Sequence, residues 1–243
     1  MRRARARLAV GLALAVGAPA LAYVPPAGRI LDAIAQANRR DDRTAVLSVP
    51  VEVRLAGSDT PLRGELETHP SGFARLELVH PDGARERHLA RGGRHGASRD
   101  GVVLDGAEPL VPPLFLLQAR TRSALTTALL EMGVAVDLAE LGHEGRHDCF
   151  VIGGREIPPP PPGLPGARAA LWADLDTFEV VRVDDRSGLR FRFGPPVPSG
   201  ATRLPGWAEV QRGGELRAWL GLGEARPASL SVADFGWSWL TGP

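Results

Sequence analysis

Apolar and polar residues alternate along much of the chain, and this period of two is typical of half-buried β-strands. The first such stretch runs from Leu47 to Leu55, and others follow at 62–69, 73–80 and 84–92. The turn sequences Pro-Ser-Gly and Pro-Asp-Gly separate them. Alternating strands joined by short turns predict an antiparallel meander. Pro50 lies inside the first strand and indicates a sheet edge or a bulge, because proline has no backbone N–H to donate.

Two stretches instead follow the helical period. Ile30, Leu31 and Ile34 form one apolar stripe within 28–40, which predicts a short amphipathic helix. The segment 112–141 carries apolar residues near helical spacing, and Gly133 divides it into two predicted helices. Strand-like alternation then returns at 147–154, 167–177, 179–188, 189–196, 206–214 and 215–223. Five consecutive prolines within 157–166 predict an extended polyproline loop, which we interpret as a stiff surface spacer.

These elements together predict an α+β fold built on a curved antiparallel sheet, open as a half β-barrel. Each strand of such a sheet has one apolar face that must be buried. The N-terminal helix and the insertion at 112–141 are the elements that can cover it, so we expect the insertion to lie over the concave face as a helical lid. The pattern continues without a break in composition, and we expect a single domain over 23–243.

The first 22 residues have the pattern of a secretory signal peptide. Four arginines precede an apolar stretch at 8–18, and Ala20-Leu21-Ala22 offers a small-x-small cleavage site. The apolar stretch is shorter than the roughly 20 residues that a membrane-spanning helix needs. The sequence therefore predicts export to the periplasm.

Composition narrows the choice of partners. The formal net charge is +1, and removal of the four arginines of the signal peptide leaves 25 basic against 28 acidic residues, a charge of −3. This balance argues against nucleic acid as a partner. The single cysteine, Cys149, lies in an apolar strand-like run and cannot form an internal disulfide, so we expect a buried structural thiol. No nucleotide-binding fingerprint occurs, and no cofactor is predicted.

His143, Glu144 and His147 form an H-E-x-x-H sequence. On a helix these residues would bind zinc and supply a general base, which gives a zinc metallopeptidase as the alternative function. Gly142 and Gly145 each disfavour a helix by about 1 kcal/mol, and a strand-like run starts directly after His147. We therefore interpret the sequence as a solvated turn with neither metal nor enzymatic activity, and expect Glu144→Gln to leave stability unchanged.

Two stretches of the second half resemble the LolA/LolB-like outer-membrane lipoprotein-sorting proteins. Residues 145–153, ending in Val-Ile-Gly, are similar to one strand of that family, and residues 170–182 resemble its hairpin with Leu-Trp-x-Asp, a threonine and a closing arginine. The chain departs from the family in its polyproline loop and in a Gly- and Pro-rich turn at 194–206. The resemblance implies a periplasmic carrier that shelters the acyl chains of a lipoprotein or another lipid. Its partners would be an inner-membrane release complex and an outer-membrane acceptor.

The candidate binding site is an apolar cavity between lid and sheet. The lid contains three consecutive apolar residues at 115–117, more than one buried stripe requires, which suits a cover that contacts both sheet and ligand. Ordinary core packing explains the same triplet, and a lipid- or lipoprotein-sensing envelope-stress domain would use the same cavity. The predicted lining is Leu47, Val49, Val51, Leu66, Leu76 and Leu78 from the sheet, with Phe115, Leu117, Leu125 and Leu129 from the lid.

Cleavage of the signal peptide is directly testable. We expect protein from the envelope fraction to begin at Tyr23, because the small-x-small site ends at Ala22. N-terminal sequencing of that fraction measures this. Recovery of an intact Met1 would show that the segment is not a cleaved signal.

Overall fold

The computed structural model describes residues 23–40, 45–91, 93–107, 109–154 and 168–242. The predicted signal peptide at 1–22 and the predicted polyproline loop at 157–166 lie outside these ranges.

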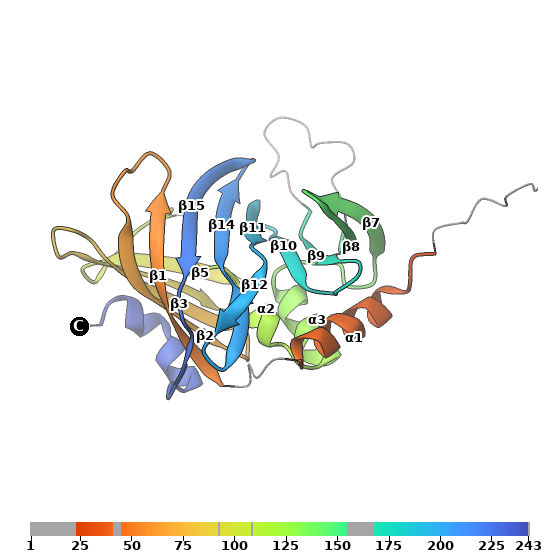
Figure 1. The fold of residues 1–243 in the computed structure, drawn as a ribbon. Helices are drawn as coiled ribbons and strands as arrows, with labels where there is room; N and C mark the ends of the chain where they lie inside the picture. Colours follow the sequence, from red (N-terminus) through yellow and green to blue (C-terminus); the bar gives the residue numbers. More distant parts are fainter. Residues whose placement is uncertain (1–22, 41–44, 92, 108, 155–167, 243) are drawn as a thin grey trace, which may run out of the picture.

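Two series of strands, separated by two helices, make up most of the chain (Figure 1). The first series follows α1 (Ala27–Asn38) and comprises β1 (Val46–Leu55), β2 (Leu62–His69), β3 (Phe73–Val79), β4 (Arg85–Arg91), β5 (Arg94–Arg99) and β6 (Val102–Val103). The helices are α2 (Phe115–Gln118) and α3 (Arg122–Glu131). The second series comprises β7 (Ala139–Glu144), β8 (His147–Ile152), β9 (Ala170–Asp174), β10 (Val180–Asp184), β11 (Leu189–Phe193), the hairpin β12 (Pro196–Ser199) and β13 (Thr202–Pro205), then β14 (Trp207–Arg212) and β15 (Glu215–Leu222). The last described elements are β16 (Arg226–Ala228) and the 3-10 helices η1 (Val232–Phe235) and η2 (Trp237–Leu240).

Apart from the hairpin β12–β13, which forms a separate two-stranded sheet, both series and β16 join in one curved antiparallel sheet of 14 strands. The order is β6-β5-β4-β3-β2-β1-β15-β14-β11-β10-β9-β8-β7, and β16 pairs with the start of β1. The pairing of β1 with β15 therefore links the first series to the last strand of the second. Since β6 and β7 lie at opposite ends of this order, the sheet does not close into a barrel. The predicted α+β fold with an open, curved antiparallel sheet is confirmed.

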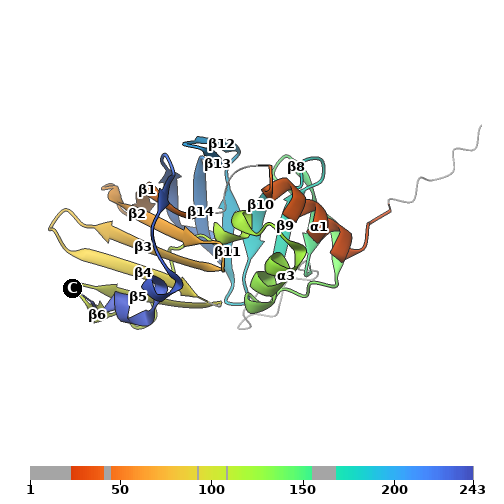
Figure 2. The same cartoon turned by 90° about the horizontal axis from the view of Figure 1, so that it is seen from below.

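The helices cover one face of the sheet. In Figure 2, α1 and α3 lie side by side against the part of the sheet formed by β8 to β11. The apolar stripe of α1 and the apolar residues of α2 and α3 share one hydrophobic core with alternate residues of the strands. This face is the one that the sequence predicts to be covered. Among the described residues, no helix is long and apolar enough to span a bilayer.

The opposite face of the first strand series is covered by the C-terminal segment. Phe235 and Leu240 pack against Leu89 and Val46 in a separate small core. Arginines of β3 and β4 stack on the aromatic rings of this segment: the guanidinium of Arg75 lies 4.9 Å from the centre of the Trp239 ring and 5.5 Å from that of Phe235. These stacks combine apolar contact with a cation–π attraction, so the C-terminal segment stabilises the sheet.

The expectation of a second helix in the insertion is wrong. The insertion at 112–141 was expected to continue as a second helix after Gly133, but α3 ends before that glycine and residues 139–144 form β7. Gly133 has φ +86°, its N–H bonds to the carbonyl of Leu130, and the N–H of Val134 bonds to that of Leu129. This backbone path closes the helix at its C-terminus. The strands β5, β6 and β16 and the hairpin β12–β13 were not predicted.

Pro50 does not mark a sheet edge, because β1 is central and pairs with β2 along one side. Its carbonyl accepts a bond from the N–H of Gly223 at 2.8 Å, so the backbone nitrogen of Pro50 faces the same side. On that side β15 pairs with residues 51–55 and β16 with residues 46–48. Pro50 thus lies where one neighbouring strand ends and the next begins, and a missing N–H leaves the ladder with β2 intact.

The C-terminal cover can be tested by truncating its buried aromatic ring. Phe235 is fully buried, and we expect Phe235→Ala to lower the free energy of unfolding by about 3–5 kcal/mol. Val232 in the same 3-10 helix is 40% exposed, and Val232→Ala should change it by less than about 0.5 kcal/mol. Denaturant unfolding of both variants measures the difference, and equal losses would contradict the role assigned to the segment.

Candidate functional site

The lid, defined by the structure as residues 109–131, is buried along its first part. Residues 109–119 are all buried, although α2 itself spans only Phe115–Gln118. The ten residues predicted to line a cavity are buried, and all belong to the one hydrophobic core. The structure therefore brings the predicted lid and sheet residues together, with the lid packed against the sheet in a closed arrangement.

Polar side chains that the sequence analysis did not single out fasten the lid. Asn38, at the end of α1, donates from Nδ2 to the carbonyls of Leu116 and Ala119 at 2.8 and 2.9 Å. These bonds are buried and satisfy lid carbonyls that lie away from water.

A second polar contact joins the lid to the sheet. Thr68 of β2 donates from Oγ1 to Oε1 of Gln118 at 2.9 Å, and Nε2 of Gln118 donates to the carbonyl of Ala45 at 2.9 Å. We call Asn38, Thr68 and Gln118 the latch. The sequence carries a signal for the latch, because each residue is polar in apolar surroundings. Asn38 lies on the apolar stripe of α1, Thr68 on the apolar face of β2, and Gln118 in the apolar run of α2.

The H-E-x-x-H residues lie on the hairpin of β7 and β8. Gly145 has φ +61° in the turn, and Glu144 pairs with His147 across it. His143 contacts Asp148 and His147 contacts Asp174, so the histidines have different carboxylate partners. This hairpin does not provide the shared helical face that a zinc peptidase motif needs. Among the described residues, no group of three or more His, Cys, Asp or Glu is placed to hold a metal ion.

Glu144 is nevertheless not in a solvated turn, which corrects the expectation from sequence. Its carboxylate accepts a bond from Nη1 of Arg182 at 2.8 Å and one from Nε of Arg192 at 2.7 Å. Burial alone would raise the pKa of Glu144, but the bonds and charges of the two arginines outweigh it and lower that pKa. The guanidinium of Arg182 also lies 4.3 Å from the centre of the Trp172 ring. The outer face of the second strand series is thus held by an ionic and aromatic network.

Cys149 belongs to the small apolar cluster beneath this network, with Val151 and Trp172. Its side chain is fully buried, which confirms the expected structural thiol. Burial, together with the charge of Asp174, raises the pKa of Cys149 to about 11. The thiol is therefore protonated and shielded at neutral pH.

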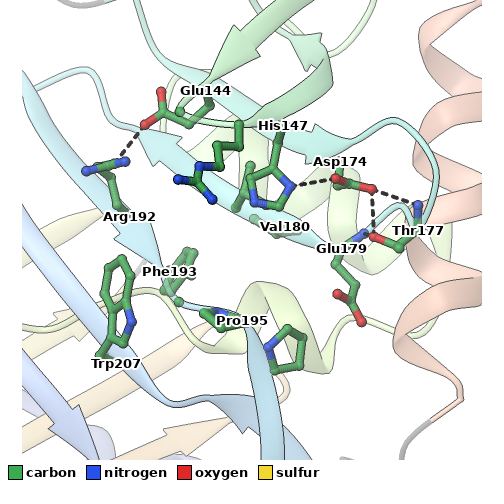
Figure 3. A pocket seen from close by; sticks show the side chains of 15 residues that line it. Glu144, His147, Asp174, Thr177, Glu179, Val180, Arg192, Phe193, Pro195 and Trp207 are labelled. Atoms are coloured by element: carbon green, nitrogen blue, oxygen red, sulfur yellow. Dashed lines mark hydrogen bonds and ion pairs between the residues drawn. The ribbon is translucent and has the colours of Figure 1, made fainter.

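A cleft of about 300 Å³ opens beside the hairpin on this outer face (Figure 3). We call it the outer cleft. Glu144 and Arg192 lie at one end, the His147–Asp174 pair at the other, and Phe193 and Trp207 line the side opposite the hairpin. Its volume is at the lower limit of small-molecule sites, which run from about 300 to 1,000 Å³. The sequence analysis did not predict this cleft, since it assembles residues of β7 to β11, β12 and β14.

Three solved structures resemble this chain, and each match covers 89% of it and 100% of the other chain. A LolA superfamily protein from Nitrosomonas europaea has a TM-score of 0.50 at 12% identity. A DUF1329 family protein from Desulfovibrio piger has a TM-score of 0.50 at 14% identity. A putative outer membrane lipoprotein-sorting protein domain from Vibrio parahaemolyticus has a TM-score of 0.49 at 11% identity.

No protein-family model and no curated protein sequence matches the chain. At these identities the solved structures share the fold alone. The chain has the fold of the LolA superfamily, which confirms the predicted resemblance at that level.

The role of Glu144 gives a stability prediction. Glu144→Gln should lower the free energy of unfolding by about 2 kcal/mol at pH 7, because two charge-assisted bonds lose their anionic acceptor. The pKa of Glu144 is lowered in the folded chain, so its contribution is present above the unfolded pKa of about 4.3 and lost as pH falls through the folded value. Urea unfolding at pH 7 and at low pH should show the two proteins converging in acid. His143→Gln is the control, since the His143 side chain is 63% exposed. Equal stability of Glu144→Gln and wild type at pH 7 would contradict the network.

Proposed function

We propose that this chain is a periplasmic carrier that shelters the acyl chains of lipoproteins, or of other lipids, between its lid and its sheet during sorting to the outer membrane. The observation that carries the proposal is the lid itself. A continuous buried segment at 109–119, apolar apart from Gln118, lies on the sheet in a fold shared with a LolA superfamily protein. The proposed cargo is an acylated lipoprotein or lipid. The proposed partners are an inner-membrane release complex and an outer-membrane acceptor.

The energetics of such a lid suit a carrier. Opening it exposes apolar surface on both lid and sheet, and an acyl chain between them covers that surface again. Each buried CH₂ contributes about 0.8 kcal/mol. The ligand thus replaces lid–sheet contacts with lid–ligand and sheet–ligand contacts, so the net change stays small enough for release.

The latch joins the lid to α1 and to β2 through specific polar contacts. The latch bonds of Asn38 and Gln118 are made in the closed arrangement, and separation of the lid from α1 and β2 would break them. They therefore favour the empty, closed state over the loaded one. This makes the latch a control on affinity rather than a ligand-binding group.

The peptidase alternative is not supported. Its three residues lie on a β-hairpin, and Glu144 is held by two arginines instead of facing a metal-bound water. The proposed function is accordingly that of a binding protein and not of an enzyme.

The latch provides the test. Wild-type protein should bind a fluorescent triacylated lipopeptide saturably, and Asn38→Ala should bind it roughly tenfold more tightly. The reason is that the variant loses two closed-state bonds worth about 1.4 kcal/mol together, and tenfold in affinity corresponds to that energy. Fluorescence titration measures both constants.

Ser98→Ala is the matched control. It removes a buried hydrogen bond to the carbonyl of Leu240, in the C-terminal cover and away from the lid. It should lower stability without raising affinity. If wild type does not bind the lipopeptide, or if Asn38→Ala binds no more tightly, the lid is an ordinary part of the core and the proposal fails.

A further inference from the structure

The sheet separates locally between β10 and β11. The two strands pair only from Arg182 opposite Arg192 to Asp184 opposite Arg190. Beyond this point Val180 pairs with Ala173 of β9, while Phe193 pairs with Ala208 of β14. The register of β10 is also irregular between Val180 and Arg182. At this end β10 stays paired with β9, and β11 with β14, so β10 and β11 are not paired with each other. We call this unpaired stretch the split.

A cleft lies on each face of the sheet at this split. The outer cleft contains Glu144 and Arg192, whose side chains lie on the face away from the helices. A second cleft, of about 50 Å³, contains Ala37 and Asn38 of α1 and Leu117 of α2, on the helical face. We call it the inner cleft.

The two clefts share part of their lining. Glu179, Val180, Gly194 and Pro196 line both of them. Glu179 and Val180 come from the β10 side of the split, and Gly194 and Pro196 from the β11 side. The outer cleft and the inner cleft, which reaches Leu117 in the lid, therefore meet the same four residues at the split.

Three of the four residues that line both clefts, Val180, Gly194 and Pro196, have no polar side-chain group. Gly194 has no side chain, and the indole of Trp207 packs where one would lie, since a Cβ atom there would be 2.5 Å from its Nε1. Val180 belongs to the hydrophobic core as well as to both clefts. The inner end of this route reaches Leu117 of the lid and Asn38 of the latch.

We propose that an acyl chain enters the space under the lid through the split between β10 and β11, with the outer cleft as its mouth and the inner cleft as its route to Leu117. This inference rests on the proposed carrier function. It names a side entrance through the sheet, so that the ligand reaches the lid at the point where Asn38 fastens it. A linear chain suits the route, because the shared lining is apolar and backbone-rich apart from the Glu179 carboxylate, which lies 3.8 Å from the guanidinium of Arg203 in the inner cleft.

A bulky side chain at the shared lining tests the route. Pro196 is half-buried and lines both clefts, while Val197 beside it is 38% exposed and lines neither. Stopped-flow mixing with the fluorescent lipopeptide should show Pro196→Trp associating and dissociating at least tenfold more slowly than wild type, with an equilibrium constant within about twofold. Val197→Trp, with the same added bulk on the same hairpin, should match wild type.

A chemical block provides a second variant should Pro196→Trp fail to fold. Glu179→Cys places a thiol at the split, and the native Cys149 is fully buried with a pKa of about 11, so a bulky maleimide will react at the new site. The adduct should slow association at least tenfold, and unmodified Glu179→Cys should not.

The outcomes separate the two proposals. Wild-type rates in both Pro196→Trp and the Glu179→Cys adduct would overturn the side entrance while leaving the carrier in place. Failure of wild type to bind the lipopeptide would overturn the carrier function, and the entrance with it.

Discussion

Burial of the concave face of the sheet is the constraint on which the rest of the structure depends. Alternate residues of at least ten strands point to that face, and apolar surface left in water costs about 25 cal/mol for each Å². The sheet does not close, so it cannot bury this face against itself. Helices from two distant parts of the chain cover it instead. Because α2 is only four residues long, its carbonyls need partners outside the helix, and Asn38 bonds to the carbonyl of Leu116 and to that of Ala119 directly after the helix.

The outer face is stabilised by different means in its two halves. The C-terminal segment covers the first strand series through Phe235, Leu240 and the arginine–aromatic stacks. In the second series Trp172 lies under Arg182, which Glu144 and Asp184 hold in place. Between β10 and β11 the pairing stops short, and the two clefts lie there. The same sheet is thus covered or cross-linked over much of its outer face and interrupted between β10 and β11, near the lid.

Much of this fold follows from local pattern. Alternation identifies β2 at 62–69 with the bounds that the structure gives, and the stripe of Ile30, Leu31 and Ile34 identifies α1. What local pattern misses depends on contacts far along the chain. Pro50 suits a central strand only because β15 ends and β16 begins beside it, some 170 residues later in the sequence. Glu144 belongs to a network because β10 and β11 bring Arg182 and Arg192 to the hairpin.

The candidate site also has features that the sequence predicts and features that it does not. The burial of its ten apolar residues could be predicted, since one buried face of each strand and one face of the lid are visible in the sequence. The polar latch residues stand out on their apolar stretches, but their bonding partners could not be predicted, and neither could the split, because both depend on the spatial neighbours of Asn38, Gln118 and Val180. Predicting them would have required the strand order and the path of the lid across the sheet.

The central claim is that the space under the lid accepts an acyl chain. Native mass spectrometry of the protein purified from cell envelopes without detergent tests it most directly. The account predicts a mass surplus equal to one acylated ligand, which is lost on extraction with organic solvent and restored by added lipopeptide. Folded protein that shows only the mass of the mature chain, both as purified and after addition of lipopeptide, would contradict it.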